Sequence, residues 1–300
     1  MLMYTGRHKG EYDDFKIFYK GGPPECRIFN VNTSEFTSVP PPRGRYGCTP
    51  PMLVVPPNGS WGTRIFFFGS IHYANDTLFA RLSDMEWFDV DRGIWTSSGH
   101  RALFDMDNAS IALINSTTAI LCGGGRTPSV PRNRCLEVCL VTYRTTKLPY
   151  MMRARSMHAV VRYMKSIIAI GGRNCSSNSH IECEQLEIGS PNWTTMTSPN
   201  ETFSACNAIV VDIYLYVIDC VNTTHIEAYN GSVWSLIAIP QLYNFPRRST
   251  PPFEYDGKLA VMDRDEGNIL MFDNISDAWT ILPGSSYPHC ITCTAVSQLF

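Results

Sequence analysis

The sequence predicts an all-β protein that is built from six copies of one small unit. Short apolar strands recur along the 300-residue chain at a nearly constant distance, and four copies also place a tryptophan after a polar turn. Self-similarity at such a period is typical of stacked supersecondary units. With 44% hydrophobic residues, the chain can bury a large core as a single all-β domain.

Each copy begins with an apolar strand that ends at a fixed marker, usually a glycine pair. In the fourth copy, residues 167–170 lead into Gly171-Gly172. In the last two copies the glycine pair is lost, but the strand keeps its phase. The markers start at Gly21, Gly69, Gly123, Gly171, Asp219 and Asp263, which lie 48, 54, 48, 48 and 44 residues apart.

A second strand follows each marker and passes through a tight polar turn into a further strand with an aromatic residue. In the fifth copy, residues 226–229 precede the turn at 230–232, and Trp234 comes next. This order predicts a β-hairpin in each copy. The third copy has no aromatic residue at this place. The equivalent residues of the other copies are Phe36, Trp95, Trp193 and Trp279.

This combination resembles the kelch-repeat β-propellers, in which a Gly-Gly pair follows the second strand and a Tyr and a Trp flank the turn between the third and fourth strands. The resemblance covers residues 12–300. In that family each repeat forms a four-stranded blade, so the resemblance implies a six-bladed kelch-type β-propeller around a central channel. The tryptophans would then fill the gaps between blades, and the glycines would allow close backbone approach near the axis.

The expected domain organisation follows from the positions of the copies. Residues 1–12 would form an N-terminal extension, and residues 13–300 a single propeller with repeats starting near residues 13, 45, 107, 155, 203 and 248. The first copy has no first strand of its own, whereas residues 289–300 form a strand without a repeat. We therefore expect residues 290–299 to pair beside residues 15–20, which would complete blade one and close the ring.

Charge and hydropathy exclude several classes of partner. The net charge of −2 gives no general attraction to nucleic acid or to a membrane surface. The longest apolar stretch, residues 208–220, is too short to cross a bilayer and is interrupted by Asp212. The first residues lack the apolar core of a signal peptide, so the sequence shows no route into the secretory pathway. The oligomeric state stays open.

Eleven Asn-x-Ser/Thr sequons point instead to an extracellular glycoprotein. Chance would place about three of the asparagines in sequons. The alternative is turn chemistry, because polar turns also favour Asn, Gly, Ser and Thr. The candidate glycosylation sites are Asn32, Asn58, Asn75, Asn108, Asn115, Asn174, Asn192, Asn200, Asn222, Asn230 and Asn274.

The eleven cysteines raise the same question of compartment. In an oxidising compartment, cysteines that the hairpins and loops bring together would form disulfides. In the cytosol they would remain buried thiols. No paired Cys-x-x-Cys pattern occurs, so we expect neither a zinc site nor another metal or cofactor. The candidate disulfides are Cys26–Cys290, Cys175–Cys183 and Cys206–Cys220.

No residue pattern points to catalysis. The seven histidines are scattered, without His-x-His or His-Glu-x-x-His spacing, and no glycine-rich loop leads into a phosphate-binding helix. The propeller enzyme galactose oxidase needs two Tyr, two His and a Cys linked to Tyr, and no such set can be chosen here. We therefore expect a protein that is not an enzyme, with a galactose-oxidase-like activity as the less favoured alternative.

Arginines precede the first strand of several copies, and equivalent positions in a propeller share one face. In BTB-kelch proteins, which the chain resembles in layout, arginines and serines at this position bind acidic peptide segments. A guanidinium group is suited to carboxylates. The alternative is that the arginines pack along the blades and pair with Glu182, Glu184 or Asp273. The implied partner-binding residues are Arg45, Arg155, Ser156, Ser204, Arg248 and Ser249, with Tyr287 and His289 beside the closing strand.

The expected function is therefore a non-catalytic protein-interaction scaffold that binds a partner protein or an acidic peptide through one loop face. The loops at residues 126–134 and 71–75 are further candidate contacts, because loops on a rigid scaffold carry recognition. A BTB-kelch-like protein would use this face to recognise substrates of a ubiquitin ligase in the cytoplasm. The alternative is an extracellular adhesion or receptor propeller that carries N-glycans.

Overall fold

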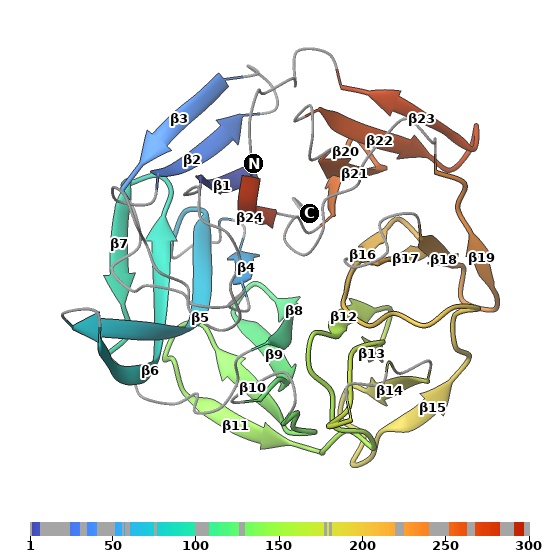
Figure 1. Ribbon diagram of the computed structural model, residues 1–300, viewed down its shortest axis with the longest axis horizontal. Helices are drawn as coiled ribbons and strands as arrows, with labels where there is room; N and C mark the ends of the chain where they lie inside the picture. The colour runs from blue at the N-terminus through green and yellow to red at the C-terminus, as the bar shows by residue number, and fades with distance from the viewer. Residues whose placement is uncertain are drawn as a thin grey trace.

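The protein is an all-β β-propeller in the computed structural model. The structure describes residues 2–6, 25–30, 35–40, 52–55, 57, 61–74, 77–99, 108–125, 130–176, 179, 182–219, 225–239, 252–262, 268–282 and 291–296. Within these residues, 24 strands form six four-stranded antiparallel sheets, which stand around a common centre (Figure 1). A helix with the length and apolar character needed to cross a membrane does not occur in this part of the chain.

Five of the sheets are blades made of four consecutive strands, and each is named here after its first strand. The β4 blade contains β4 (Met52–Val55), β5 (Arg64–Ala74), β6 (Thr77–Asp89) and β7 (Ile94–Ser97). The β8 blade contains β8 (Ala109–Asn115), β9 (Thr118–Gly123), β10 (Cys135–Cys139) and β11 (Thr145–Leu148). The β12 blade contains β12 (Ala159–Tyr163), β13 (Ser166–Ile170), β14 (Cys183–Glu187) and β15 (Thr194–Met196).

The remaining two blades follow the same order. The β16 blade contains β16 (Cys206–Val211), β17 (Tyr214–Asp219), β18 (Ile226–Tyr229) and β19 (Trp234–Leu236). The β20 blade contains β20 (Phe253–Tyr255), β21 (Lys258–Met262), β22 (Ile269–Asp273) and β23 (Ala278–Ile281). The first strands lie toward the centre and the fourth strands form the rim (Figure 1).

The sixth sheet is a composite of the two chain ends. Its order is β24 (Ile291–Val296), β1 (Leu2–Gly6), β2 (Glu25–Asn30) and β3 (Glu35–Val39). Strand β24 lies antiparallel to β1, with Leu2 opposite Val296. The expected extension at residues 1–12 therefore contributes a strand, and β24 pairs with this strand. Residues 15–20, the expected partner of the closing strand, lie outside the described residues.

The predicted closed ring of six equivalent blades is wrong. Contacts between sheets run from β24 to β4 and onward through β8, β12 and β16 to β20. Among the described residues, no contact of comparable extent leads from the β20 blade back to the composite sheet. The protein is thus a propeller with five blades of consecutive strands. The composite sheet stands beside them and contacts the β4 blade. The first predicted copy corresponds to the composite sheet, and not to a blade of four consecutive strands.

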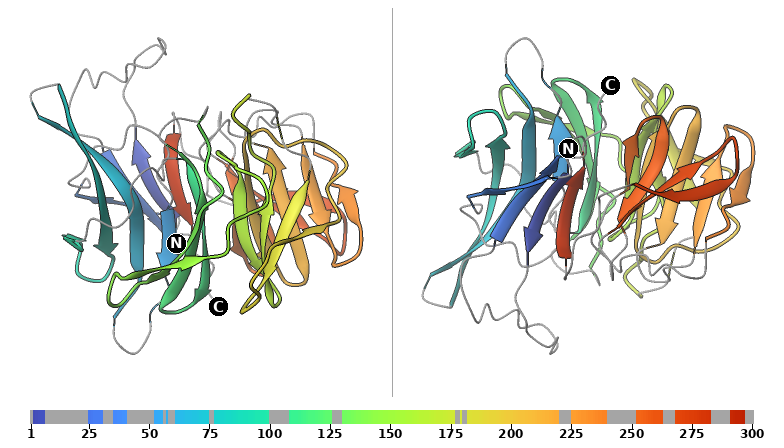
Figure 2. Two further views of the ribbon diagram at one scale, coloured as in Figure 1. Left: turned by 90° about the horizontal axis from the view of Figure 1, so that it is seen from below. Right: turned by 90° about the horizontal axis from the view of Figure 1, so that it is seen from above.

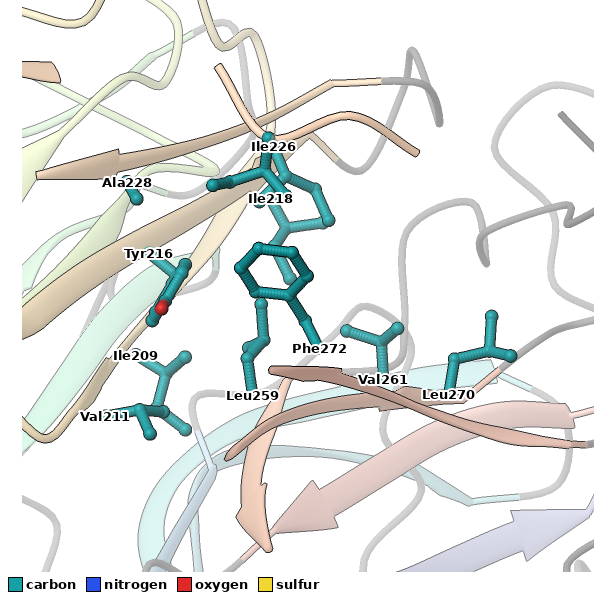
Figure 3. Packing of buried hydrophobic residues seen from close by; sticks show 11 residues of the cluster. Ile209, Val211, Tyr216, Ile218, Ile226, Ala228, Leu259, Val261, Leu270 and Phe272 are labelled. Carbon is teal, nitrogen blue, oxygen red and sulfur yellow. The ribbon is translucent and has the colours of Figure 1, made fainter. Parts of the chain in front are cut away.

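Apolar side chains from neighbouring blades form the core. Between the β16 and β20 blades, Tyr216 and Ile218 face Leu259 and Phe272 (Figure 3). The rings of Tyr216 and Phe272 meet edge to face at 6.3 Å. Because each blade buries both faces against its neighbours, its inner strands are continuous apolar runs rather than alternating ones.

The phased tryptophans join successive sheets, as the sequence predicted. The indole N–H of Trp193 donates to the carbonyl of Pro149, just after the outer strand of the preceding blade. Trp234 donates in the same way to Thr197, and Trp279 donates to Ala238. Trp95 extends the pattern by donating to Pro40, just after β3 of the composite sheet. Each ring thus covers an inter-blade gap and also satisfies its own polar group.

The glycine pair allows the close backbone approach that we expected. Gly171 and Gly172 both have positive φ values, 61° and 88°. A Cβ atom on Gly171 would lie 2.6 Å from the carbonyl oxygen of Phe203, and one on Gly172 would lie 2.7 Å from that of Ser156. Only glycine therefore fits between the second strand of this blade and the two segments that precede β12 and β16.

Candidate partner-binding face

The connections between strands lie at two opposite faces of the molecule, seen from the side in Figure 2. Turns between first and second strands and between third and fourth strands lie at one end, because the sheets are antiparallel. We call this the turn face. The connections from second to third strands, and those from one blade to the next, lie at the other end. We call this the loop face.

Backbone hydrogen bonds hold three segments of the loop face side by side. The N–H of Arg155 donates to the carbonyl of Arg132 at 3.0 Å. Ser156 and Arg173 exchange two hydrogen bonds, of 3.1 and 2.9 Å. A further bridge pairs Arg173 with Ser179. A loop of the β8 blade, the segment before β12 and a loop of the β12 blade therefore form one small β-layer.

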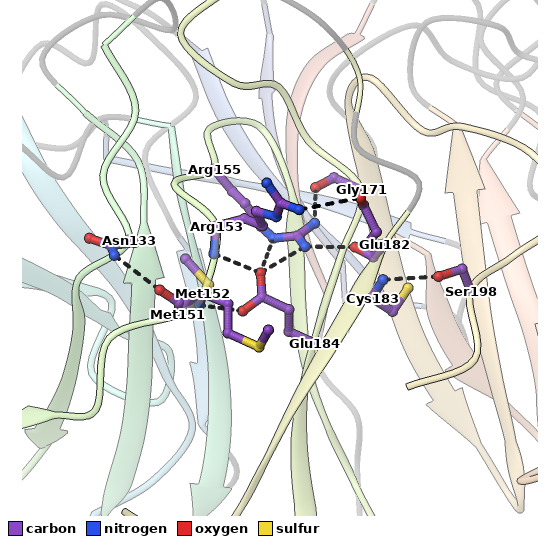
Figure 4. Close-up of polar contacts among 10 residues, drawn as sticks. All are labelled: Asn133, Met151, Met152, Arg153, Arg155, Gly171, Glu182, Cys183, Glu184 and Ser198. Carbon is purple, nitrogen blue, oxygen red and sulfur yellow. Dashed lines mark hydrogen bonds and ion pairs between the residues drawn. The ribbon is translucent and has the colours of Figure 1, made fainter. Parts of the chain in front are cut away.

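Arg155, a predicted partner-binding residue, lies at the centre of this layer but is completely buried. Its Nε and Nη2 atoms donate to Oε1 of Glu184, at 3.2 and 2.9 Å. Nη1 donates to the carbonyl of Gly171 at 2.7 Å, and Nη2 also donates to that of Glu182 at 2.6 Å (Figure 4). The guanidinium group is therefore held entirely by the protein.

Glu184 is as deeply buried as its partner, with 1% of its side chain exposed. Besides Arg155, it accepts hydrogen bonds from the backbone N–H groups of Met152 and Arg153 (Figure 4). A buried carboxylate is stable only when it is paired and hydrogen-bonded, and both conditions are met here. The ion pair thus fixes the segment that leads into β12.

The prediction that Arg155 and Ser156 contact a partner is wrong, because both side chains are buried. The alternative that we considered, pairing with Glu184, describes Arg155 correctly. Ser204 is half-buried and accepts a hydrogen bond from Nη2 of Arg173 at 3.4 Å. The other predicted contact residues, Arg45, Arg248, Ser249, Tyr287 and His289, lie outside the described residues.

Apart from Arg153, which is exposed and pairs with Glu182, the arginines that reach the surface of the loop face come from other positions. Arg132 is exposed, and Arg134 and Arg173 are half-buried. Arg132 and Arg134 belong to the loop at residues 126–134 that we considered as a candidate contact. Arg173 was missed, although it directly follows the glycine pair, which places it at the start of a loop in the repeat. These three arginines and Ser204 form the candidate binding face.

The β16 blade repeats the buried glutamate without the arginine. Glu227 accepts hydrogen bonds from the backbone N–H groups of Asn200 and Glu201 and from Nδ2 of Asn200. Its Oε1 lies 3.4 Å from Nε2 of His225. Phe203, also fully buried, occupies the place that Arg155 has in the preceding blade, and its ring contacts that of His225 at 5.7 Å.

The cysteines pair differently from our prediction. Cys122 and Cys135 lie opposite each other on β9 and β10 and form a buried disulfide with a Cα–Cα distance of 4.1 Å. Cys175 and Cys183 are both thiols, so their predicted bond is wrong. Cys175 is exposed in a loop, whereas Cys183 begins β14 inside the core, where burial raises its pKa to about 12.

The two other predicted disulfides concern residues outside the described part. Cys206 is a buried thiol whose Sγ donates to the carbonyl of Ile170 at 3.3 Å. Cys206 lies opposite Asp219, one residue earlier than we assumed. Cys220 and Cys290 lie outside the described residues. The residues that are described contain no cluster of three or more His, Cys, Asp or Glu side chains suited to a metal ion.

Fold and site together define a β-propeller with an arginine-bearing loop face. Its fold matches 588 chains of solved structures, so the architecture is widely shared and does not identify one function. One of them is YjhT, with a TM-score of 0.67 and 11% sequence identity, over 86% of this chain and 90% of that one. This likeness establishes the propeller fold alone. No protein-family profile and no curated protein matches the sequence.

Proposed function

We propose that this protein is a non-catalytic interaction scaffold of the kelch type, which binds a partner protein or an acidic peptide through its loop face. The carrying observation is the small β-layer, which brings Arg132 and Arg173 to either side of the buried Arg155. With Arg134 they place three guanidinium groups on adjacent loops. Guanidinium groups bind carboxylates with two parallel hydrogen bonds, which favours acidic ligands.

The buried ion pair beneath this face supports the proposal through rigidity. Arg155 and Glu184 fix the segment before β12, and this segment hydrogen-bonds to the backbone of both Arg132 and Arg173. A face whose backbone is held in this way loses little conformational entropy when a ligand binds. Within the proposal, a BTB-kelch-like ubiquitin-ligase adaptor is one setting, in which the loop face would recognise the protein to be delivered.

An extracellular adhesion or receptor propeller is the second candidate setting. The specific observation in its favour is the Cys122–Cys135 disulfide in the core. Disulfides of this kind persist in oxidising compartments and are rare in the cytosol. The binding face would be the same in either setting, because it does not depend on the compartment.

Charge reversal on the loop face tests the proposal. The probe is a fluorescein-labelled oligoglutamate peptide, and its binding is measured by fluorescence anisotropy. We expect R132E/R173E to weaken binding at least ~10-fold, because each lost charge-assisted hydrogen bond is worth about 1.5–3 kcal/mol. The control is R144E, which makes the charge change of either single substitution, R132E or R173E, at an exposed residue of the turn face. Equal weakening by the control, or no binding by the unmodified protein, would refute the proposal.

A further inference from the structure

The turn face carries exposed sequons on four blades. Asn115 ends β8 before its turn, and Asn192, Asn230 and Asn274 lie in the turns that precede the fourth strands. All four asparagines are exposed. A hydrogen bond joins neighbouring turns of this face: the hydroxyl of Tyr163 donates to the carbonyl of Ile213, 2.8 Å away on the next blade. The four sequons therefore share one side of the molecule.

For two of the four asparagines, Asn115 and Asn230, the turn holds the side chain in a defined orientation. Oδ1 of Asn115 accepts hydrogen bonds from both the N–H and the hydroxyl of Thr117, at 2.9 and 3.0 Å. Oδ1 of Asn230 accepts from the N–H groups of Ser232 and Val233, both at 3.0 Å. Because Oδ1 and Nδ2 branch from one carbon, an oxygen directed into the turn leaves Nδ2 on its outer side. Such Asx turns involve only local residues, so they form before the blades pack.

Two other sequons serve the fold instead. Asn108 is 8% exposed and its Nδ2 is buried, while the hydroxyl of Ser110 in the same sequon accepts the N–H of Val160 at 2.8 Å. Asn200 donates its Nδ2 to the buried Glu227 at 2.8 Å. An oligosaccharide on Asn108 would have no room in the folded protein, and one on Asn200 would disturb the Glu227 network.

The turn face also exposes large apolar side chains beside its sequons. Ile275 directly follows Asn274 and is 98% exposed, and Val233 in the turn after Asn230 is 59% exposed. Met164 and Ile213 are exposed in turns between first and second strands of the same face. Exposed apolar groups on one face are places where an interaction or an attached chain can reduce contact with water. The neighbouring asparagines are positions at which a hydrophilic chain could be attached.

We propose that the turn face is N-glycosylated at Asn115, Asn192, Asn230 and Asn274, which shields its apolar turns and leaves the loop face open to a partner. The inference rests on the extracellular setting of the proposed function. In the reaction, Nδ2 attacks C1 of a lipid-pyrophosphate-linked oligosaccharide. The Nδ2–C1 bond forms, the C1–O bond to the pyrophosphate breaks, and the Nδ2 proton passes to a base of the transferase.

Asn174 is a sequon that must not carry a glycan if the loop face binds a partner. It is a half-buried sequon on the loop face, directly after Arg173. Although its Oδ1 also accepts an N–H, from Ser176 at 2.9 Å, an oligosaccharide here would cover the arginines of the binding face. If the turn face is glycosylated and the loop face binds a partner, Asn174 must stay unmodified.

Site mapping on the protein purified from its own cells tests the inference. Enzymatic release of N-glycans in water enriched in oxygen-18 converts each glycosylated Asn to labelled Asp, which is read by peptide mass spectrometry. We expect label at Asn115, Asn192, Asn230 and Asn274. Label at Asn108, Asn174 or Asn200, or its absence from the four turn asparagines, would overturn the inference. The loop-face proposal is judged separately by R132E/R173E, so the two can fail independently.

The shielding role has its own readout in the full chain produced through a secretory pathway. N115Q should lower the mass by one glycan, whereas the control N108Q should leave the mass unchanged. Removal of the glycans from the folded protein should increase binding of an apolar dye severalfold. This increase should be smaller in I275S, which keeps the Asn274 sequon. An equal increase in both proteins would contradict the shielding role.

Discussion

The β12 and β16 blades place a glutamate at the same point of their third strands but balance it in different ways. Glu184 and Glu227 each accept two backbone N–H groups from the segment that precedes their blade. Arg155 then completes the first site, whereas Asn200 and His225 complete the second. The glutamate is thus the constant element that fixes the loop, and its polar partners vary.

The comparison explains why we wrongly expected Arg155 to contact a partner. At the position of Arg155, the β16 blade has Phe203, which is equally buried. A position that accepts either a buried phenylalanine or a buried arginine belongs to the core of the repeat rather than to its surface. The binding arginines must therefore be sought on the loops that this core supports.

The largest expected effect comes from giving the β12 blade the aromatic residue of its neighbour. R155F leaves Glu184 buried without a cation, which should lower the free energy of unfolding by about 3–5 kcal/mol. Urea denaturation of the purified protein measures this loss. A variant as stable as the parent would show that the backbone N–H groups alone suffice for Glu184.

The double variant R155F/E182H sharpens the same comparison. Glu182 lies two residues before Glu184, as His225 lies two residues before Glu227. The added histidine should restore about 1–2 kcal/mol relative to R155F, a coupling typical of residues in direct contact. E182H alone is the control and should cost less than ~1 kcal/mol, because its exposed pair with Arg153 contributes little. If the losses of R155F and E182H simply add in the double variant, a histidine at position 182 does not support Glu184 as His225 supports Glu227.

The β8 blade has a leucine where the β12 and β16 blades have the glutamate, and a disulfide cysteine at the residue before it. Its third strand begins Cys135-Leu136, in place of Cys183-Glu184 and Ile226-Glu227. C122S/C135S should lower the free energy of unfolding by about 3 kcal/mol, the value expected for a disulfide that closes a loop of this length. The test is thermal and urea unfolding against C139S, which removes a thiol of the same blade. Equal losses in both variants would exclude a role of the cross-link.

The smallest effect concerns the half-buried ion pair of the β20 blade. Nζ of Lys258 lies 2.9 Å from Oδ2 of Asp273, and this hydrogen bond, with backbone N–H groups of Ser276 and Ile275, lowers the pKa of Asp273 to about 2. A lowered carboxyl pKa stabilises the folded state above the unfolded pKa, and this contribution is lost as the pH falls from about 4 through 2. Urea midpoints of D273N should therefore show slightly less acid dependence than those of the parent. An unchanged acid dependence would assign it to other carboxylates.

The sequence predicted the repeated parts of the fold because they depend on single residue types. A tryptophan that bridges blades and a glycine that avoids a clash have no common substitute, so Trp193 and Gly171 stand out in the chain. Strand β1 has no such signature, because five residues with extended backbone suffice for it. We therefore expected the C-terminal strand to pair beside residues 15–20, whereas β24 pairs with β1.

The site was harder to predict because exposure and register depend on loop length. Nothing in the sequence around Arg155 distinguishes it from an exposed arginine, and only the length of the segment before β12 brings it over Glu184. The same applies to Cys122 and Cys135, which meet because the loop from Gly124 to Arg134 lets β9 and β10 pair in one register.

The indole hydrogen bonds all run backward along the chain, and this direction has a consequence for synthesis. After β3, β11, β15 and β19, a backbone carbonyl accepts a hydrogen bond from a tryptophan that lies 55, 44, 37 and 41 residues further on, respectively. A blade that leaves the ribosome thus lacks this hydrogen bond until most of the next blade has been synthesised. During synthesis, the outer edge of a blade is therefore fixed only when the tryptophan of the next blade has been added.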